Sequence, residues 1–220
     1  TLAELMNLEK LPRSIEAFDI SNIQGTDSVA SMVTWKDGQM KKKGYRKFII
    51  KTVSGIDDYK SMVEVITRRY RRLIKENQSL PDLVLVDGGI GQLHAAASAL
   101  DALDLITQPL ASIAKKEELI YVRGNEQEPI RLEQHSPVLR LIQKIRDESH
   151  RFALTFHRQR RSTRTLSSTL LKIPGVGDKT AKLLLQRLGS VRRIASIPSD
   201  QLAQAVSPKI AKNVYDYFHK

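Results

Sequence analysis

The 220-residue sequence contains no cysteine. This absence excludes disulfide scaffolds, cysteine-ligated zinc sites, iron–sulfur clusters and thiol nucleophiles. It also fits a protein of a reducing compartment such as the cytoplasm. Long hydrophobic runs are also lacking, because Asp, Lys or Arg interrupts each apolar stretch before the roughly 20 residues that a membrane span needs. The chain begins with Thr1, and no charged-then-apolar leader opens it. We therefore expect a fragment of a longer soluble protein without a membrane partner.

Acidic residues are scarce relative to basic ones, with 24 Asp and Glu against 36 Lys and Arg, which gives a net charge of +12. The excess is uneven: residues 162–220 hold ten Lys or Arg and three Asp, a net charge of +7. A basic segment of this kind indicates a polyanionic partner, most often nucleic acid. A basic solvated surface is the alternative, and charge alone does not decide between them.

Periodicity predicts an α/β fold for the first two thirds of the chain. Short apolar or alternating segments predict strands over Ser14–Ile20, Asp27–Trp35, Tyr45–Ile50, Leu83–Val86, Leu110–Ala114, 120–122 and 130–132. Helices are expected over a lead-in segment at 1–13 and over 55–77, 91–103 and 137–161. A meander followed by alternating strands and helices predicts one mixed sheet with helices packed on its faces.

The remaining residues predict a separate helical domain. The polar and basic segment 159–168 has no core residues and is a candidate linker. Only helices are visible after it, from 166 to 217. We therefore expect an α/β domain over 1–158, a linker over 159–168 and a small all-α domain over 169–220.

Two carboxylates follow or interrupt apolar strands. Asp19 lies between Phe18 and Ile20, and burying an ionised carboxylate without compensation costs several kcal/mol. Asp87 directly follows the apolar run Leu83–Val86. If the two strands are neighbours, the carboxylates converge and provide hard oxygen ligands for Mg²⁺ or Mn²⁺. For Asp87 alone, a strand-to-helix turn with a capping Asp is an equally good interpretation.

Further candidates lie on the helices. His150, on the long helix, is able to complete such a metal site or to move a proton near neutral pH, although a partly exposed surface histidine is the more common case. Asp147 and Glu148 are neighbours with the same potential role. Asp57 and Asp58 open a helix, where N-capping is the default explanation.

The most specific local pattern lies in the tail, at Ile173-Pro174-Gly175-Val176-Gly177. The two glycines permit a tight turn and a close approach of the backbone to a ligand. The following helix start, with Lys179, Thr180 and Lys182, then favours a DNA phosphate, while a plain packing corner is the alternative. An equivalent position at 205–211 lacks both glycines, which predicts weak or no phosphate binding there.

Basic runs occur in the α/β part as well. Residues 41–43, 46–47 and 68–72 could line a duplex path or form ordinary solvated faces. Lys115 and Lys116 directly follow a predicted strand, as Asp87 does. We expect one of them, Lys115, to reach the site and hold a phosphate.

Five segments together resemble the C-terminal half of UvrC, the nuclease family of bacterial nucleotide excision repair. In chain order they are Phe18–Asn22, Gly55–Tyr59, Leu85–Gln92, Ser112–Lys116 and Arg146–Ala153. The resemblance implies an RNase H-like endonuclease domain followed by a tandem helix-hairpin-helix domain. It places catalytic positions at Asp19, Asp87 and His150, with Asp58 as a fourth.

The resemblance also implies a function. It implies incision of damaged double-stranded DNA on the 5′ side of the lesion by a cytoplasmic, metal-dependent enzyme of the DNA-damage (SOS) response. UvrB is the implied partner, mainly through segments that this chain lacks, with UvrA involved indirectly, and the chain is expected to be a monomer. A non-catalytic DNA-binding module is the alternative from another class. A further alternative is another RNase H-like nuclease, such as a junction resolvase or an RNA-strand nuclease.

Overall fold

The structure is a computed structural model that describes residues 1–23, 27–114 and 119–219. Its contacts divide the chain into two compact units, Thr1–Phe156 and His157–Lys220, and each unit is described by itself. Among the described residues, no helix is long and apolar enough to cross a membrane.

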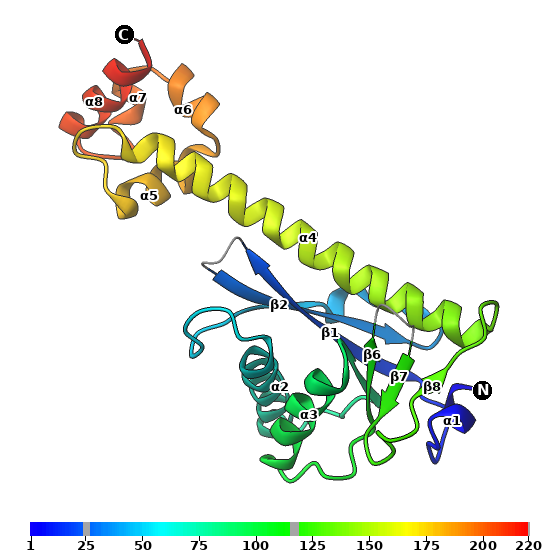
Figure 1. The fold of residues 1–220 in the computed structure, drawn as a ribbon. Coiled ribbons are helices and arrows are strands. Elements are labelled where there is room, and N and C mark those ends of the chain that lie inside the picture. The colour runs from blue at the N-terminus through cyan, green and yellow to red at the C-terminus, as the bar shows by residue number, and fades with distance from the viewer. Residues whose placement is uncertain (24–26, 115–118, 220) are drawn as a thin grey trace. The chain divides into compact units, whose positions relative to one another are not determined.

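The first unit is built on one mixed sheet (Figure 1). The strands follow the order β3-β2-β1-β5-β6-β7-β8, and β4 pairs with β2 beside β3. The strands are β1 (Ser14–Ile23), β2 (Asp27–Lys36), β3 (Gln39–Met40), β4 (Arg46–Ile49), β5 (Leu83–Asp87), β6 (Leu110–Ala114), β7 (Leu119–Val122) and β8 (Ile130–Arg131). The expected mixed sheet is confirmed, with boundaries within a few residues of those predicted.

The first strands form the predicted antiparallel meander. The turn between β2 and β3 has positive φ at Asp37 (48°) and Gly38 (82°), as a tight hairpin turn requires. A short 3-10 helix, η1 (Lys42–Gly44), then interrupts the edge strand, so β3 and β4 pair with different parts of β2. This interruption was not expected from the sequence.

Parallel pairing of β1, β5 and β6 forms the centre of the sheet. Asp82, just before β5, joins the starts of β1 and β5. One of its carboxylate oxygens accepts hydrogen bonds from the backbone N–H groups of Arg13 (3.0 Å) and Ser14 (2.9 Å) and from the Ser14 hydroxyl (2.8 Å). The other oxygen lies 3.1 Å from the ammonium of Lys10. This cluster fixes the register of β1 against β5.

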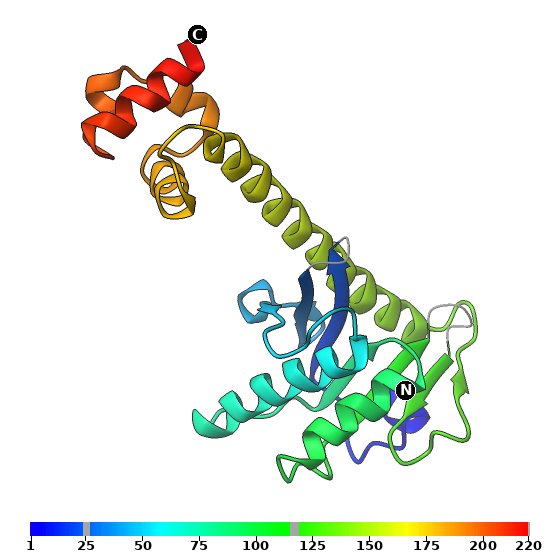
Figure 2. The same cartoon turned by 60° about the vertical axis from the view of Figure 1, so that its left-hand side comes forward.

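Helices cover both faces of the sheet (Figures 1 and 2). On one face lie α2 (Asp58–Lys75) and α3 (Ile90–Asp101), whose apolar side chains form a core with Phe18 and Val86. On the other face lie α1 (Leu2–Leu5) and the first part of α4 (Pro137–Leu171), which pack on Ala17 and Leu85. Alternate residues of β1 and β5 therefore face different helices.

Two helical predictions differ from the structure. The expected lead-in helix over 1–13 is a single turn, α1, and the chain turns at Asn7, which has a φ of 48°. The residues expected to form a linker, 159–168, continue α4 as a helix. Helical hydrogen bonds are local and Arg and Gln are good helix formers, so a segment without core residues can still be helical.

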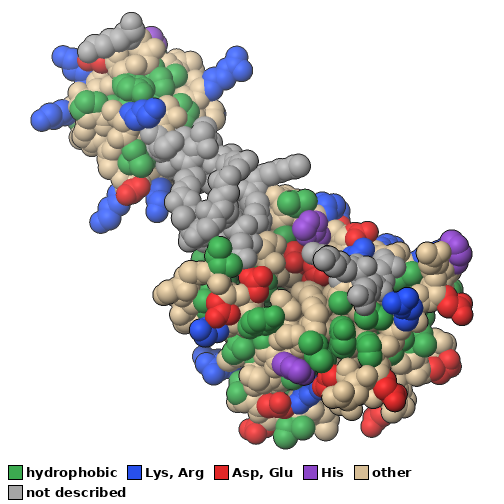
Figure 3. Space-filling model, viewed as in Figure 1, with side chains coloured by type: hydrophobic (Ala, Val, Ile, Leu, Met, Phe, Trp, Pro, Cys, Tyr) green, Lys and Arg blue, Asp and Glu red, His purple; other side chains and the backbone are tan. Residues whose placement is uncertain are grey.

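The second unit consists of short helices around its own small core. The helices after α4 are α5 (Asp178–Leu188), α6 (Val191–Ser196), α7 (Ser199–Leu202) and α8 (Pro208–His219). Leu170, Ile173, Leu184, Leu202 and Val214 are among the buried residues that they share. Lys and Arg side chains project around this unit on the face that Figure 3 shows.

Candidate active site and nucleic-acid interface

Asp19 and Asp87 lie side by side at the centre of the sheet. Phe18 pairs with Val86 in the parallel register of β1 and β5, so the two Asp residues are the next residues of neighbouring strands. Adjacent strands are about 4.8 Å apart, and paired residues point to the same face. Because Ala17 and Leu85 face α4, both carboxylates also belong to the α4 face. The sheet thus brings together the two acids on which the sequence hypothesis depends.

Asp19 is buried, with 3% of its surface exposed. Its Oδ2 accepts a hydrogen bond from the Ser21 hydroxyl at 3.0 Å, and the same oxygen lies 3.7 Å from Nδ1 of His150. The His150 side chain is about half exposed (53%), so its ring contacts both the carboxylate and solvent. Asp19, Asp87 and His150, each singled out from the sequence, thus come from β1, β5 and α4.

Asp58 is placed differently from the prediction that both acids cap the helix. Asp57 is the N-cap of α2 and accepts a hydrogen bond from the Lys60 backbone at 2.9 Å, whereas Asp58 is the first helical residue. A side chain at Gly91, near the start of α3, would meet the ring of Tyr59. The Tyr59 ring at the start of α2 therefore occupies space that this glycine leaves at the start of α3.

The neighbouring acids on α4 are already engaged. Glu148 accepts hydrogen bonds from both the Tyr45 hydroxyl (2.9 Å) and the guanidinium of Arg151 (2.6 and 2.7 Å). The hydrogen bond from Arg151, followed by that from Tyr45, lowers the pKa of Glu148 despite its partial burial. Asp147 is exposed and lies 3.2 Å from Arg146. These contacts favour His150 over both acids as the functional group of this helical turn.

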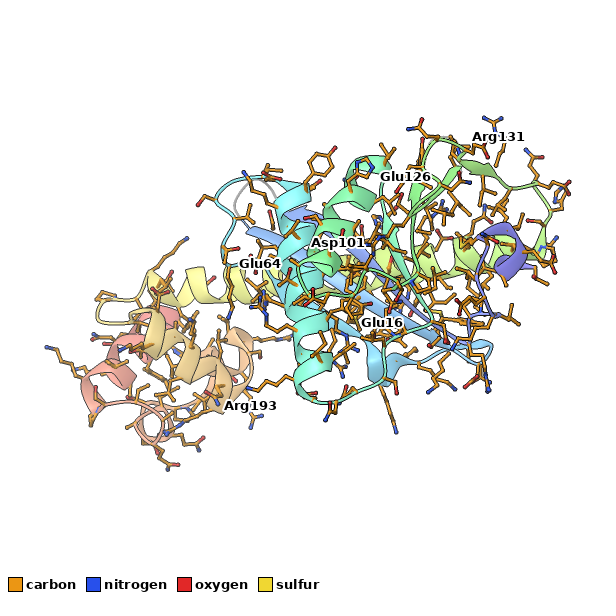
Figure 4. All side chains as sticks on the ribbon, turned by 90° about the horizontal axis from the view of Figure 1, so that it is seen from below. Glu16, Glu64, Asp101, Glu126, Arg131 and Arg193 are labelled. Atoms are coloured by element: carbon orange, nitrogen blue, oxygen red, sulfur yellow. The ribbon has the colours of Figure 1, made fainter. Side chains whose placement is uncertain are left out.

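Acids on the opposite face serve packing. Figure 4 labels Glu16 of β1 and Glu64 of α2, and both labels lie beside α2. Glu16 is buried and paired with the guanidinium of Arg69 at 2.5 Å, which ties β1 to α2. Glu64 accepts hydrogen bonds from the backbone of Lys51 and Thr52 and from Arg68. A buried carboxylate in this fold is therefore not by itself a sign of catalysis.

The carboxylates on the α4 face fit a divalent cation. The described residues contain no group of three or more His, Asp and Glu side chains arranged to hold a metal ion. Mg²⁺, however, usually binds through one or two carboxylates together with water and substrate phosphates. The neighbouring oxygen donors of Asp19 and Asp87 meet that requirement, and His150 adds a nitrogen donor beside them.

The first tail hairpin has the backbone that its glycines suggested. Gly175 has a φ of +84°, which side chains disfavour, and Asn213 of α8 holds the turn by donating to the Pro174 carbonyl at 2.8 Å. Gly177 is the N-cap of α5, and a Cβ there would have no atom within 4 Å. Exposed Lys179 and Lys182 follow in the first turns of α5, with Thr180 between them.

The second tail hairpin resembles the first in outline. Pro208 begins α8 as Asp178 begins α5, and Lys209 and Lys212 occupy the same helix positions as Lys179 and Lys182. Ser207 precedes α8 where Gly177 precedes α5. The two helix starts therefore present lysines at the same positions, but Asp178 has no counterpart in α8, and the backbone before the helix also differs.

Other predicted contacts have mixed outcomes. Lys115 lies outside the described residues. In the run 68–72, Arg68, Arg69 and Arg72 pair with Glu64, Glu16 and Glu76, so this run is mainly structural. Sequence reasoning missed Ser21 beside Asp19, and a hydroxyl two residues from a buried strand acid was the available signal.

Comparison with known proteins bears on the whole chain. A family model described as the UvrC RNase H endonuclease domain matches residues 3–154, and one described as a helix-hairpin-helix motif matches residues 166–220. The catalytic domain of human endonuclease V is also similar, at 22% identity with a TM-score of 0.37, over 48% of this chain and 46% of that chain. The family models confirm the expected RNase H-like and helix-hairpin-helix folds.

Curated relatives share the same family. UvrABC system protein C of Koribacter versatilis is 57% identical over 217 residues, which cover 99% of this chain and 36% of the relative. That of Solibacter usitatus is 58% identical, over 99% of this chain and 35% of the relative. The chain thus spans about a third of the length of these relatives. On this evidence the chain belongs to the UvrC family and carries its RNase H endonuclease domain together with a helix-hairpin-helix motif.

Proposed function

We propose that this chain is a metal-dependent DNA endonuclease that makes the 5′ incision beside a lesion in nucleotide excision repair. The observation that carries the proposal is the position of Asp19 and Asp87 as neighbours on one face of the sheet, with His150 3.7 Å from Asp19. Membership of the UvrC family supports the substrate, damaged double-stranded DNA, and a role beside UvrA and UvrB.

Asp19 and Asp87 are the residues that would hold Mg²⁺ or Mn²⁺. When bound, such an ion polarises the phosphate and lowers the pKa of water to give a nucleophile. The hydrogen bond from Ser21 orients the Asp19 carboxylate. His150 faces Asp19 through Nδ1 and is half exposed, so its other ring nitrogen is available to exchange a proton with water or with the leaving oxygen.

The helix-hairpin-helix unit binds the DNA backbone in this proposal. The positive φ of Gly175 and the open space at Gly177 leave the hairpin backbone and the α5 N-terminus accessible to a phosphate. Lys179 and Lys182 add positive charge, and Thr180 lies between them. Contacts of this kind carry no base information, which suits an enzyme whose substrate is defined by a lesion.

The test is Asp19→Asn in the full-length protein. We expect nicking of a lesion-containing plasmid, assayed with UvrA, UvrB and Mg²⁺ or Mn²⁺, to fall at least on the order of 100-fold, because an amide is a poor replacement for a metal-binding carboxylate. DNA binding should remain unchanged. Asp104→Asn, the same change at an exposed position, is the matched control.

Retained nicking by Asp19→Asn would refute the assignment of the site. Absence of nicking by the unsubstituted protein on lesion DNA, with binding intact, would instead favour a non-catalytic DNA-binding module. Preference for a four-way junction or an RNA–DNA hybrid would indicate another RNase H-like nuclease.

A further inference from the structure

The part of α4 that carries His150 crosses β2. We call residues 148–152 the crossing turn. Its inward residue, Ser149, is buried, and the Ser149 carbonyl accepts a hydrogen bond from the buried hydroxyl of Ser31 on β2 at 3.1 Å. Ser31 pairs with Asp19 in the antiparallel register of β1 and β2. The crossing turn is therefore in direct contact with the strand beside the catalytic one.

One flank of the crossing turn is held by Tyr45, the residue before β4. Its hydroxyl donates to Oε1 of Glu148 at 2.9 Å, and its ring packs edge-on against Phe152 with centroids 5.1 Å apart. The ammonium of Lys47 lies 5.0 Å from the centre of the same Phe152 ring. Arg151 completes the arrangement by donating two hydrogen bonds to Glu148.

The charge states of Tyr45 and Glu148 suit the hydrogen bond between them. Hydrogen bonding from Arg151 lowers the pKa of Glu148, which keeps its carboxylate an acceptor. Burial, together with the contact to Glu148, raises the pKa of the Tyr45 phenol far above its ordinary value, so the phenol remains a donor. The Tyr45–Glu148 contact therefore persists across the neutral pH range.

Helix geometry connects this contact to His150. Successive residues are 100° apart around a helix, so Glu148 and His150 project on opposite sides of the inward-facing Ser149. A roll of the helix by about 20° moves a side-chain tip by roughly 2 Å, given a helix radius of about 5–6 Å including side chains. Apolar packing tolerates small rolls better than a directional hydrogen bond does. The contact on one flank thus fixes the position of the residue on the other.

We propose that Tyr45 and Glu148 are positioning residues that hold His150 beside Asp19 by preventing the crossing turn from rolling. This inference rests on the proposed function, because it assigns a role for the reaction to residues that touch neither carboxylate. Glu148 belongs to the helical segment that the sequence singled out, whereas Tyr45 lies 103 residues away in the chain.

The first experiment is Tyr45→Phe, which removes the hydroxyl and keeps the ring on Phe152. We expect kcat for nicking to fall on the order of 10- to 100-fold, as a misplacement of about 1 Å can produce, while KM and DNA affinity stay unchanged. Tyr70→Phe is the matched control, because the Tyr70 hydroxyl also contacts a buried glutamate, Glu16 (3.4 Å), but on the opposite face of the sheet. Glu148→Gln keeps an acceptor oxygen and should retain more activity than Glu148→Ala.

A double-mutant cycle separates positioning from general destabilisation. If Tyr45 acts through His150, adding Tyr45→Phe to His150→Ala causes no further loss, whereas adding Tyr70→Phe has the same effect in either background. An additive effect of Tyr45→Phe, or full activity of Tyr45→Phe, would overturn the inference. Full activity of His150→Ala would instead contradict the proposed catalytic role of His150. That result differs from the additive effect that would overturn the positioning role of Tyr45.

A readout without catalysis uses the histidine ring itself. In protein with labelled histidine, Asp19→Asn should shift the NMR signal of the His150 ring because the two groups lie 3.7 Å apart. In the Tyr45→Phe background this response should shrink, and in the Tyr70→Phe background it should persist. An undiminished response with Tyr45→Phe would show that His150 keeps its place without the Tyr45 hydroxyl.

Discussion

At the scale of single residues, burial of a carboxylate does not identify its role. Asp19 and Glu16 are both buried acids in β1. Glu16 faces α2 and is paired with Arg69, whereas Asp19 faces α4 and lies beside His150. Strand alternation alone could not separate these cases, because the partner of each acid comes from a helix distant in the sequence. The sequence singled out Asp19 because of its neighbours and did not recognise Glu16 as its structural counterpart.

Glu64 provides a prediction at this scale. Burial would raise its pKa, but hydrogen bonds from Thr52, Lys51 and Arg68 outweigh burial and lower the pKa from its ordinary value of 4.5 to about 2. A lowered pKa contributes stability above the unfolded value, and this contribution is lost as the pH falls from about 4.5 towards 2. We therefore expect Glu64→Gln to destabilise the fold by about 1–3 kcal/mol at pH 7 and by much less near pH 2.

Urea unfolding at a series of pH values measures this difference. The exposed Glu133→Gln is the matched control and should change stability little at any pH. The same free energy change for Glu64→Gln at pH 7 and at pH 2 would show that the hydrogen bonds to Thr52 and Arg68 do not depend on the charge of Glu64.

At the scale of elements, most strands were predictable and their interruptions were not. Short apolar runs bounded by Gly, Pro or Asp predicted β5 and β6, and the Asp37-Gly38 pair predicted the hairpin. The convergence of Asp19 and Asp87 was predicted only on the condition that their strands are neighbours, and the parallel pairing of β1 with β5 meets that condition. The short η1 helix and the helix over 159–168 were missed, because both depend on local backbone geometry that hydrophobic pattern does not report. The Tyr45–Glu148 contact was equally inaccessible, because it joins two elements far apart in the sequence.

Asp82 provides the prediction at this scale. Its carboxylate joins the starts of β1 and β5 through backbone and side-chain donors, so Asp82→Ala leaves the Ser14 N–H and hydroxyl without this acceptor. We expect a loss of about 1–3 kcal/mol in the free energy of unfolding, the usual cost of an unmade part-buried hydrogen bond. Asp101→Ala, which removes a surface ion pair with Arg123, should cost about 1 kcal/mol or less.

Hydrogen exchange of the β1 and β5 backbone amides locates the effect. Asp82→Ala should increase exchange at the paired residues 15–18 and 83–86, and Asp101→Ala should not. Equal stability of the two variants would mean that the apolar core alone sets the register that brings Asp19 beside Asp87.

At the scale of the whole molecule, two units with separate cores divide the proposed work. The first unit holds the carboxylates, and the second holds two similar helix starts with a lysine at the second and fifth positions of each. Over its first five residues α5 carries a net charge of +1 because of Asp178, whereas α8 carries +2, so general electrostatic attraction cannot distinguish them in favour of α5. The glycine-containing backbone before α5 can, because it allows close approach of a phosphate.

The matched variants are therefore Lys179→Gln with Lys182→Gln and Lys209→Gln with Lys212→Gln. Each pair removes two charges from the same unit at equivalent helix positions. Affinity for duplex DNA falls with salt with a slope of about 0.9 per phosphate contact. We expect the first pair to lower that slope by about 1–2 and the second pair to lower it by less than about 0.5.

Gly177→Ala should weaken binding without loss of thermal stability, since its Cβ meets no atom of the protein within 4 Å. Equal slopes for the two lysine pairs would mean that the unit binds DNA through its overall charge, and the hairpin at Gly175 would then be a packing corner.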